Sequence, residues 1–355
     1  MKRTGNLWPS ITSFENLAAA AHAAAAGKRR RPDVAAFNLN LEGELLQLRR
    51  ELERGTYLPG PYHSFRIEDP KPRHISAAPF RDRVVHNAFT RIVEPIFEKR
   101  FSNNSFACRK GFGTHRALER AKEAARRYSY VLKCDIRKYF ASIDHRILKD
   151  LLAKALKCRP TLDLAARIID GSNEQESVVA YYPGDDLFTP FERRRGLPLG
   201  NQTSQFFANV YLDPLDQVMV REMRSGAYIR YVDDFVVFEN SKERLREILA
   251  AIRSFLAPLR LDLHPGKSRI HRTADGVTFL GWRVFPDRTR LDSGNIRRFR
   301  ARMRGLQSDY AVGEVTLGEV RQRVQAWIAH AAQGNTRMLR EGLLARFAFT
   351  EGRAV

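Results

Sequence analysis

Apolar residues recur every three to four positions along most of this chain, which is the spacing of one buried helix face. Capping residues and glycines bound several of these stretches. Residues 171–195 interrupt the pattern, because Pro, Gly and charged residues dominate there, and they predict a loop. The stretches with helical spacing are 13–27, 41–54, 82–97, 114–127, 142–156, 197–219, 242–257 and most of 289–355.

Shorter stretches carry the β-branched and aromatic residues that are typical of strands. Residues 62–76 predict two strands around a proline-containing turn, which together form a basic hairpin. Residues 130–140 predict a strand that ends in a polar turn, and 228–238 predict a pair of strands. Residues 279–285 predict one strand with a tight glycine. Because helical and strand patterns mix along the chain, we expect an α+β fold.

The predicted strand pair contains two adjacent carboxylates, Asp233 and Asp234. Aspartate is unfavourable in strands and costly to bury, but it is a favoured turn residue, so a plain hairpin turn over 232–235 is one explanation. Two like charges at one turn repel each other, however, and require a nearby cation. A third carboxylate, Asp135, ends the preceding predicted strand. Three carboxylates on neighbouring strands predict a site for hard divalent ions, which take oxygen ligands.

The net charge of the chain indicates which class of molecule it binds. The 355 residues include 61 Lys and Arg against 40 Asp and Glu, a formal net charge of +21. An excess of this size favours a polyanionic partner, most simply nucleic acid, although a basic surface that binds nothing stays an alternative. Hydrophobic residues make up 43% of the chain, which predicts a globular protein and not a disordered tail.

Cysteine spacing and hydropathy indicate the compartment. The cysteines at 108, 134 and 158 form no CxxC pair and do not make an even set. This argues against a disulfide framework or a zinc site, and for a reducing cytosol. The Ala-rich start weakly resembles a signal peptide, but Glu15 and His22 interrupt it and a helix explains it better. Since no apolar run reaches about 18 residues, we expect a cytoplasmic protein without a membrane span.

Six segments, in order along the chain, resemble sequence motifs of reverse transcriptases. They are "PKPRHISAAPFRDRVVHNAF", "KCDIRKYFASIDH", "GLPLGNQTSQFFANVYLDPLD", "YVDDF", "LDLHPGKS" and "FLGWRVF". Their shared order is more specific than any single segment, and the chain is similar to reverse transcriptases of bacterial retroelements over most of its length. The resemblance implies a right-hand polymerase with an antiparallel palm sheet and a helical thumb. Its implied parts are a basic helical extension at 1–60, fingers at 61–128, a palm at 129–288 with the loop 171–195 as an insertion, and a thumb at 289–355.

By the same resemblance, Asp135, Asp233 and Asp234 are the metal ligands of a polymerase that uses two Mg²⁺ ions, with Mn²⁺ able to replace them. Ile136 offers its backbone carbonyl to a metal. Lys267 matches the loop lysine proposed as general acid toward pyrophosphate, and a solvated turn lysine is the alternative. The implied activity is RNA-directed DNA synthesis by nucleotidyl transfer, with template RNA, RNA/DNA heteroduplex and dNTPs as partners.

The resemblance also assigns residues to substrate binding. Phe140 falls where the family places an aromatic gate that excludes a ribose 2′-hydroxyl, and core filling is its alternative role. Lys71 and Arg73 correspond to triphosphate-binding residues of the fingers, or to exposed surface charges. Beside the nascent base pair the resemblance places Leu199, Gly200 and Gln205, and in the primer grip Phe279, Leu280, Gly281 and Trp282.

One motif departs from the commonest pattern of group II intron relatives. The usual Gln-Gly pair is replaced by Leu199-Gly200, and the Ser-Pro ending by Ser204-Gln205. This form resembles reverse transcriptases of diversity-generating retroelements. It implies error-prone copying at template adenines and a small basic helical accessory protein as partner. Loss of one hydrogen bond to the nucleotide, worth roughly 1 kcal/mol, would loosen discrimination severalfold.

Other hypotheses stay open. A phage-defence or retron-like reverse transcriptase would use the same chemistry with a dedicated non-coding RNA. A catalytically silent RNA-binding scaffold would need none of the carboxylates, and all three positions here are aspartate. A group II intron protein is disfavoured, because the residues outside the polymerase motifs leave no room for a maturase extension or an endonuclease domain.

Overall fold

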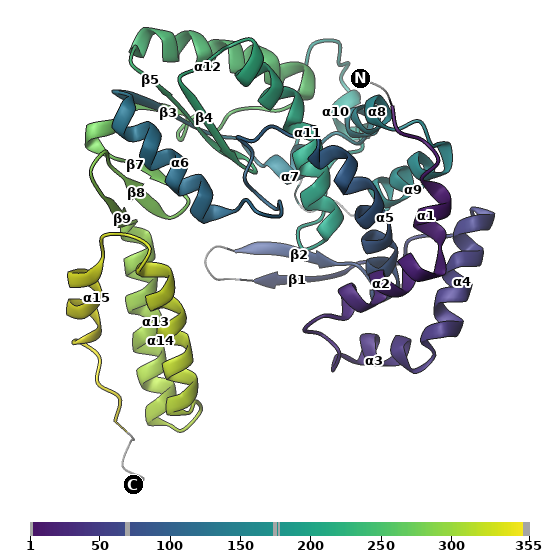
Figure 1. Cartoon of the computed structure of the whole chain (residues 1–355), viewed down its shortest axis with the longest axis horizontal. Coiled ribbons are helices and arrows are strands. Elements are labelled where there is room, and N and C mark those ends of the chain that lie inside the picture. The colour runs from purple at the N-terminus through teal and green to yellow at the C-terminus, as the bar shows by residue number, and fades with distance from the viewer. Residues whose placement is uncertain (1–2, 68–71, 173–175, 177, 351–355) are drawn as a thin grey trace.

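The computed structural model describes residues 3–67, 72–172, 176 and 178–350. Helices and antiparallel sheets make up the fold, which confirms the α+β prediction. Figure 1 shows a sheet at the upper left, a helical body beside it and a pair of long helices below the sheet. Among the described residues, no helix is both long and apolar enough to cross a membrane. Lys71, a predicted triphosphate-binding residue, lies outside the described residues.

The central sheet has the strand order β4-β5-β3-β6, and every pair is antiparallel. Its strands are β3 (Tyr130–Asp135), β4 (Ala227–Tyr231), β5 (Asp234–Glu239) and β6 (Arg269–Arg272). Leu132 packs in one hydrophobic cluster with helix α12 (Lys242–Leu256). Its neighbour Val131 packs in a second cluster with α6 (Thr114–Arg127). Because both faces of the sheet are buried, β5 reads as a continuous apolar run and not as an alternation.

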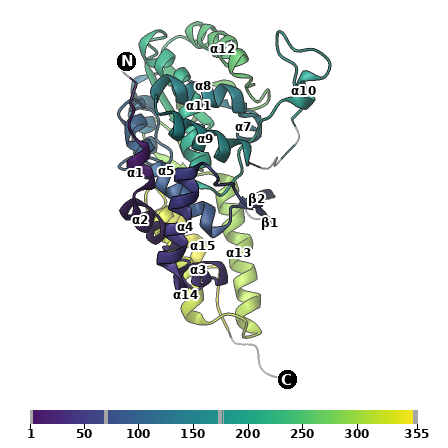
Figure 2. The same ribbon diagram turned by 90° about the vertical axis from the view of Figure 1, so that its right-hand side faces the viewer.

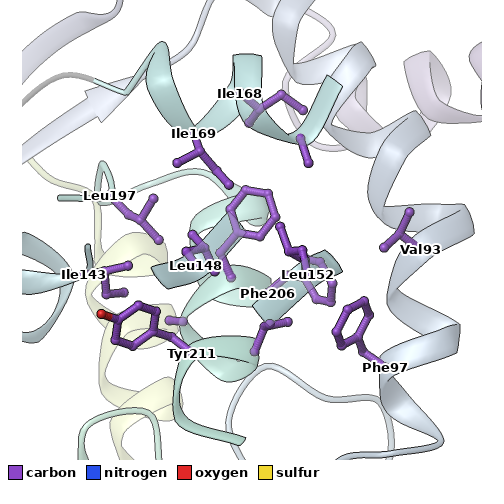
Figure 3. Packing of buried hydrophobic residues seen from close by; sticks show 14 of the residues in the cluster. Val93, Phe97, Ile143, Leu148, Leu152, Ile168, Ile169, Leu197, Phe206 and Tyr211 are labelled. Carbon is purple, nitrogen blue, oxygen red and sulfur yellow. The ribbon is translucent and has the colours of Figure 1, made fainter. Parts of the chain in front are cut away.

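The helical body is built around α5 (Phe80–Glu98) and α11 (Gln202–Arg221). Its other helices are α1 (Trp8–Thr12), α2 (Phe14–Ala25), α3 (Pro32–Leu39), α4 (Leu41–Arg54), α7 (Tyr139–Ser142), α8 (His145–Ala155), α9 (Arg159–Asp170) and α10 (Thr189–Glu192). Figure 3 shows how apolar side chains interlock there, with Phe97 near Phe206 and Leu152. The rings of Phe97 and Phe206 are 5.3 Å apart at their centroids. Helix α11 packs against α5, α8 and α12 and is held between them.

A two-stranded hairpin projects from the helical body (Figure 1). Its strands, β1 (His63–Ile67) and β2 (Arg73–Ala77), pair antiparallel, which confirms the hairpin predicted over 62–76. The amide of Ser76 donates to the carbonyl of Leu199 at 3.1 Å. This bond joins the base of the hairpin to the loop that precedes α11.

A small second sheet joins the central sheet to the C-terminal helices. The elements here are β7 (Val277–Phe279), β8 (Trp282–Val284), β9 (Thr289–Leu291), α13 (Ser293–Ala311), α14 (Leu317–Ala331) and α15 (Arg337–Leu344), with 3-10 turns at Ala257–Leu259 and Thr273–Asp275 before them. Phe299 of α13 stacks on Trp327 of α14, with ring centroids 3.6 Å apart and planes at 7°. In Figure 2, α13 and the hairpin β1–β2 project on the same side of the molecule.

Some local predictions need correction. Residues 279–285 form a hairpin and not one strand, because Leu280 and Gly281 both adopt positive φ (51° and 81°) and make a two-residue turn. The predicted loop 171–195 contains the short helix α10. Helix α3 occupies a stretch for which the sequence patterns predicted no element, and it begins at Pro32 because proline is favourable in the first turn of a helix.

Candidate active site

The aspartate pair lies where β4 turns into β5. Tyr231 pairs with Asp234 across the ladder, so the turn between them consists of Val232 and Asp233. The predicted position of the turn is therefore wrong by one residue, because Asp234 begins β5 instead of lying in the turn. The physical reason is Val232, whose φ of 58° supplies the left-handed conformation that a tight hairpin needs at its first turn residue.

Asp135 reaches the same point from the neighbouring strand. The register of β3 against β5 sets Asp135 opposite Asp234. The amide of Ile136 donates to the carbonyl of Asp233 at 3.2 Å, so the Ile136 backbone lies beside the turn. The structure thus brings the three predicted carboxylates together.

Burial and mutual repulsion perturb these carboxylates. Burial raises the pKa of Asp234 to about 7; Lys133 opposes the shift, and the other two aspartates add to it. Burial also raises the pKa of Asp233, and the charge of Asp135 contributes to that shift. Oδ1 of Asp234 is buried and has no hydrogen-bond partner among the described residues, while Oδ2 lies 3.5 Å from Lys133 Nζ. Burial and the neighbouring carboxylates therefore favour the protonated forms of Asp233 and Asp234.

Two lysines supply counter-charge at the carboxylates. Lys267 Nζ lies 3.0 Å from Asp135 Oδ1, so the loop lysine singled out from the sequence is placed at the site. The amide of His264 donates to the Asp135 carbonyl at 2.7 Å and holds the start of that loop against β3. Lys133, the other cation, donates to the carbonyl of Thr278 at 2.7 Å.

The donor chemistry fits a hard divalent cation. Mg²⁺ prefers carboxylate oxygens, and the unpartnered Oδ1 of Asp234 is such a donor. Lys267 pairs with Asp135, however, and no three His, Cys, Asp or Glu side chains of the described residues are arranged to hold a metal ion. A cation that binds the Asp135 carboxylate would therefore compete with Lys267 for Oδ1.

A cleft of about 410 Å³ opens beside the aspartate turn. The predicted site residues that line this cleft are Arg73, Phe140, Leu199 and Asp233. Tyr139 also borders the cleft but is buried, and its hydroxyl donates to the carbonyl of Ala208 at 2.5 Å. Phe140 is half-buried against it, with the two ring centroids 5.6 Å apart. Tyr139 is thus part of the hydrophobic core, whereas Phe140 is partly exposed at the cleft.

The other predicted residues are placed differently. Gln205 is exposed on α11 and is not among the described residues that line the cleft. Gly200 has a φ of 116°, and a Cβ there would lie 3.1 Å from Ile75, so this position favours glycine. Phe279 and Trp282 are buried in the second hydrophobic cluster, which also contains Val131 and residues of α6 and α13. These two aromatic side chains therefore have a core role, whereas Leu280 and Gly281 in the turn between them are half-buried.

Sequence patterns did not indicate a buried ion pair beneath the turn. Nε of Arg230 donates to Oδ1 of Asp216 at 2.7 Å, and both side chains are fully buried. Nη1 of Arg230 donates to the carbonyl of Val232 at 2.9 Å. The one signal for this pair was an arginine among the apolar residues of "YIRYVDDF", where a solvent-facing charge fits poorly.

Similarity to known proteins agrees with this geometry. A family described as "Reverse transcriptase (RNA-dependent DNA polymerase)" matches residues 67–284. Protein YkfC of Escherichia coli (strain K12) is 26% identical, over 78% of this chain and 82% of its own length. Group II intron-encoded protein LtrA of Lactococcus lactis subsp. cremoris is 22% identical, over 72% of this chain and 51% of its own length. The putative COX1/OXI3 intron 2 protein of Saccharomyces cerevisiae is 20% identical, over 62% of this chain and 32% of its own length. The chain thus spans most of YkfC but a third to a half of these two intron proteins.

The raised pKa of Asp234 predicts a pH-dependent stability. Because its folded-state pKa of about 7 lies above the ordinary value of 3.8, the native state binds more protons than the unfolded state between these values. Without divalent ions, the free energy of unfolding should therefore fall as the pH rises through this range. Asp234→Asn removes the effect and should exceed wild type by on the order of 3 kcal/mol at about pH 8, and by little near pH 4.

Urea unfolding in the presence of a chelator measures this dependence. Asp163→Asn, at a half-exposed carboxylate of α9, is the control and should keep the wild-type pH profile. If Asp234→Asn shows the same pH profile as wild type, Asp234 does not carry the perturbed pKa.

Proposed function

This chain belongs to the reverse transcriptase family of RNA-dependent DNA polymerases, and from that premise we propose that it copies an RNA template into DNA at the cleft beside the aspartate turn. One observation carries the proposal: Asp135 lies opposite Asp234, with Asp233 in the turn and lining the cleft. The family match over 67–284 contains all three carboxylates. A fold that gathers them against their mutual repulsion supports a polymerase site over a silent RNA-binding scaffold.

We assign Asp135, Asp233, Asp234 and the carbonyl of Ile136 to hold two Mg²⁺ ions, with Mn²⁺ able to replace them. Bound there, such ions supply activation of the primer 3′-hydroxyl and neutralisation of the leaving pyrophosphate. The raised pKa values of Asp233 and Asp234 support this assignment, since a nearby dication favours the charged form of both.

Other residues of the chain would handle the nucleotide. Arg73 lines the cleft, and a guanidinium suits bidentate contact with a phosphate. Lys267 lies next to Asp135, and its ammonium would donate a proton to the leaving pyrophosphate. Phe140 would lie under the sugar and exclude a 2′-hydroxyl. The positions of Arg73 and Phe140 at the cleft, and of Lys267 beside Asp135, support these roles.

Template RNA, RNA/DNA heteroduplex and dNTPs are the proposed partners. A net charge of +21 favours these partners. Helix α13, which carries exposed arginines, lies on the side of the molecule where the hairpin β1–β2 projects (Figure 2). The exposed arginines of α13 are Arg297, Arg298, Arg300, Arg302 and Arg304. On this basis we assign the extension to 1–60, the fingers to 61–128, the palm to 129–288 and the thumb to 289–355.

Within the family we propose the diversity-generating retroelement type, which copies template adenines with frequent errors. Leu199 supports this subtype, because its apolar side chain lines the cleft at the position where the commonest relatives carry glutamine. Its carbonyl is fixed by the amide of Ser76, so the residue cannot move away from the cleft without breaking that bond. A small basic helical accessory protein is part of this proposal.

Asp135→Asn tests the polymerase assignment. The amide that replaces the carboxylate cannot neutralise a dication, so primer extension on a defined RNA template with Mg²⁺ should fall about a thousandfold or more. Asp163→Asn should extend at the wild-type rate. Circular dichroism shows whether both variants are folded, and wild-type extension by folded Asp135→Asn would contradict the site.

Phe140→Ala tests the sugar gate. Without the ring, kcat/KM for ribonucleotides relative to deoxynucleotides should rise about tenfold or more, because nothing then fills the space below C2′. Tyr139→Phe is the control, since it removes only the hydroxyl that donates to Ala208 and should leave sugar selectivity unchanged. An equal response of the two variants would mean that Phe140 only fills the core.

Leu199→Gln tests the subtype. A glutamine restores a hydrogen-bonding contact to the incoming nucleotide, so misincorporation opposite template adenine should fall severalfold, measured by sequencing cDNA from a defined RNA. Leu199→Met keeps an apolar side chain of similar volume and should keep the error spectrum. If the wild-type protein makes few errors at all four template bases, the diversity-generating subtype is wrong. A phage-defence or retron-like enzyme that uses a dedicated non-coding RNA would then account for the chemistry.

A further inference from the structure

The aspartate turn contains a strained residue. Val232 has a φ of 58°, in the left-handed region that β-branched residues avoid. Glycine is the usual residue at the first position of a two-residue hairpin turn with this conformation. Backbone strain of this kind persists where the surrounding structure over-determines the local conformation. Other residues must therefore hold this turn.

Arg230 makes the contact that holds it. Its Nη1 donates to the carbonyl of Val232 at 2.9 Å and to Oδ1 of Asn209 at 3.3 Å. Its Nε and Nη2 donate to the two carboxylate oxygens of Asp216 at 2.7 and 2.5 Å. Because a planar guanidinium clamped by a bidentate carboxylate cannot rotate, Nη1 stays directed at the turn.

The support for Arg230 continues into the core. The Asp216 carboxylate is held by its two bonds to Arg230, and its Oδ1 also accepts a hydrogen bond from the hydroxyl of Tyr228 at 2.7 Å. The amide of Arg230 donates to the carbonyl of Asn104 at 2.8 Å, and its carbonyl accepts from the amide of Phe106 at 2.9 Å. Both the backbone and the side chain of Arg230 are therefore immobilised next to the turn.

We propose that Arg230 is a positioning residue for the metal-binding aspartates: it fixes the strained turn at Val232, and Asp216 fixes Arg230. Stability alone explains the pair poorly, because a buried ion pair is often no more stabilising than well-packed apolar residues of similar volume. The catalytic consequence rests on the proposed function, since Arg230 acts on the aspartates through the Val232 backbone.

Arg230→Lys tests the proposal. Lysine keeps a positive charge opposite Asp216, but a single ammonium cannot hold the carboxylate and the Val232 carbonyl in one fixed geometry. We expect amide hydrogen exchange over 231–235 to become about tenfold faster or more. Binding of Mn²⁺, followed by EPR of the free ion with primer–template present, should weaken about tenfold. In RNA-templated synthesis, kcat should fall while KM for dNTPs stays within about twofold.

Tyr228→Phe is the matched control. It removes one hydrogen bond from the same Asp216 carboxylate and leaves the contact between Arg230 and the turn in place. We expect a lower Tm but wild-type hydrogen exchange over 231–235, wild-type Mn²⁺ binding and wild-type kcat. If both variants lose these properties equally, the positioning role is overturned and the pair is purely structural.

A second substitution provides a rescue. Glycine adopts a positive φ without strain, so Arg230→Lys combined with Val232→Gly should recover most of the lost Mn²⁺ affinity, and no recovery would overturn the proposal. If Arg230→Lys does not fold, Asp216→Asn keeps Arg230 but replaces the bidentate carboxylate that clamps its guanidinium, and it should show changes of the same kind. Wild-type hydrogen exchange and Mn²⁺ binding in that variant would also overturn it.

Hydrogen exchange separates this inference from the proposed function. If the wild-type protein makes no DNA on RNA templates, the proposed function fails. Faster exchange over 231–235 in Arg230→Lys, without a change in Tyr228→Phe, still supports the positioning role in that case. Unchanged exchange in Arg230→Lys counts against it whether or not the protein is active.

Discussion

The partial burial of three neighbouring carboxylates is the constraint on which the rest of this structure depends. The pKa of Asp234 is raised to about 7 first by burial and then by the charges of Asp233 and Asp135, and the whole shift corresponds to an opposing free energy of at most about 4 kcal/mol. The next four residues of β5, 235–238, are Phe-Val-Val-Phe and are fully buried. Burying four such side chains stabilises the fold by on the order of 6–12 kcal/mol, as an upper estimate. The apolar strand therefore outweighs the cost of burying Asp234 beside two other carboxylates, and it holds the three where they would not gather by themselves.

The two lysines at this site differ in how firmly they are held. Lys133 is bonded to the carbonyl of Thr278, and its side chain is 19% exposed, so its charge stays opposite Asp234. Lys267 lies on a loop with its side chain 48% exposed, and Asp135 is the partner of its ammonium. Lys267 is therefore less constrained by the fold than Lys133, and it is the lysine to which we assign proton donation toward the leaving pyrophosphate.

Sequence patterns predicted the parts of this site that depend on local chemistry. Asp135 ends a strand and Asp233 lies in a hairpin turn, and their proximity follows from the pairing of neighbouring strands. The exact turn was not predictable, because turn chemistry favours Asp over valine in the left-handed region, and Val232 is held there by tertiary contacts. The pair of Arg230 with Asp216 was missed for the same reason: it joins a strand to a helix and leaves no periodic signal in either.

Helix α11 runs from the loop of Leu199, which we propose selects the nucleotide, to Asp216, which holds Arg230 beneath the aspartate turn. Leu199 and Asn201 lie just before its first turn, where Asn201 donates to the carbonyl of Ser76 at 3.3 Å and helps join the cleft to the hairpin β1–β2. Asp216, which clamps Arg230, lies near its other end, roughly 20 Å further along the helix at 1.5 Å per residue. Because α5, α8 and α12 hold the helix between them, a change at one end is not transmitted easily to the other. In the proposed function, Leu199 therefore alters which nucleotide is accepted while the aspartate turn, held through Arg230 and Asp216, keeps its geometry.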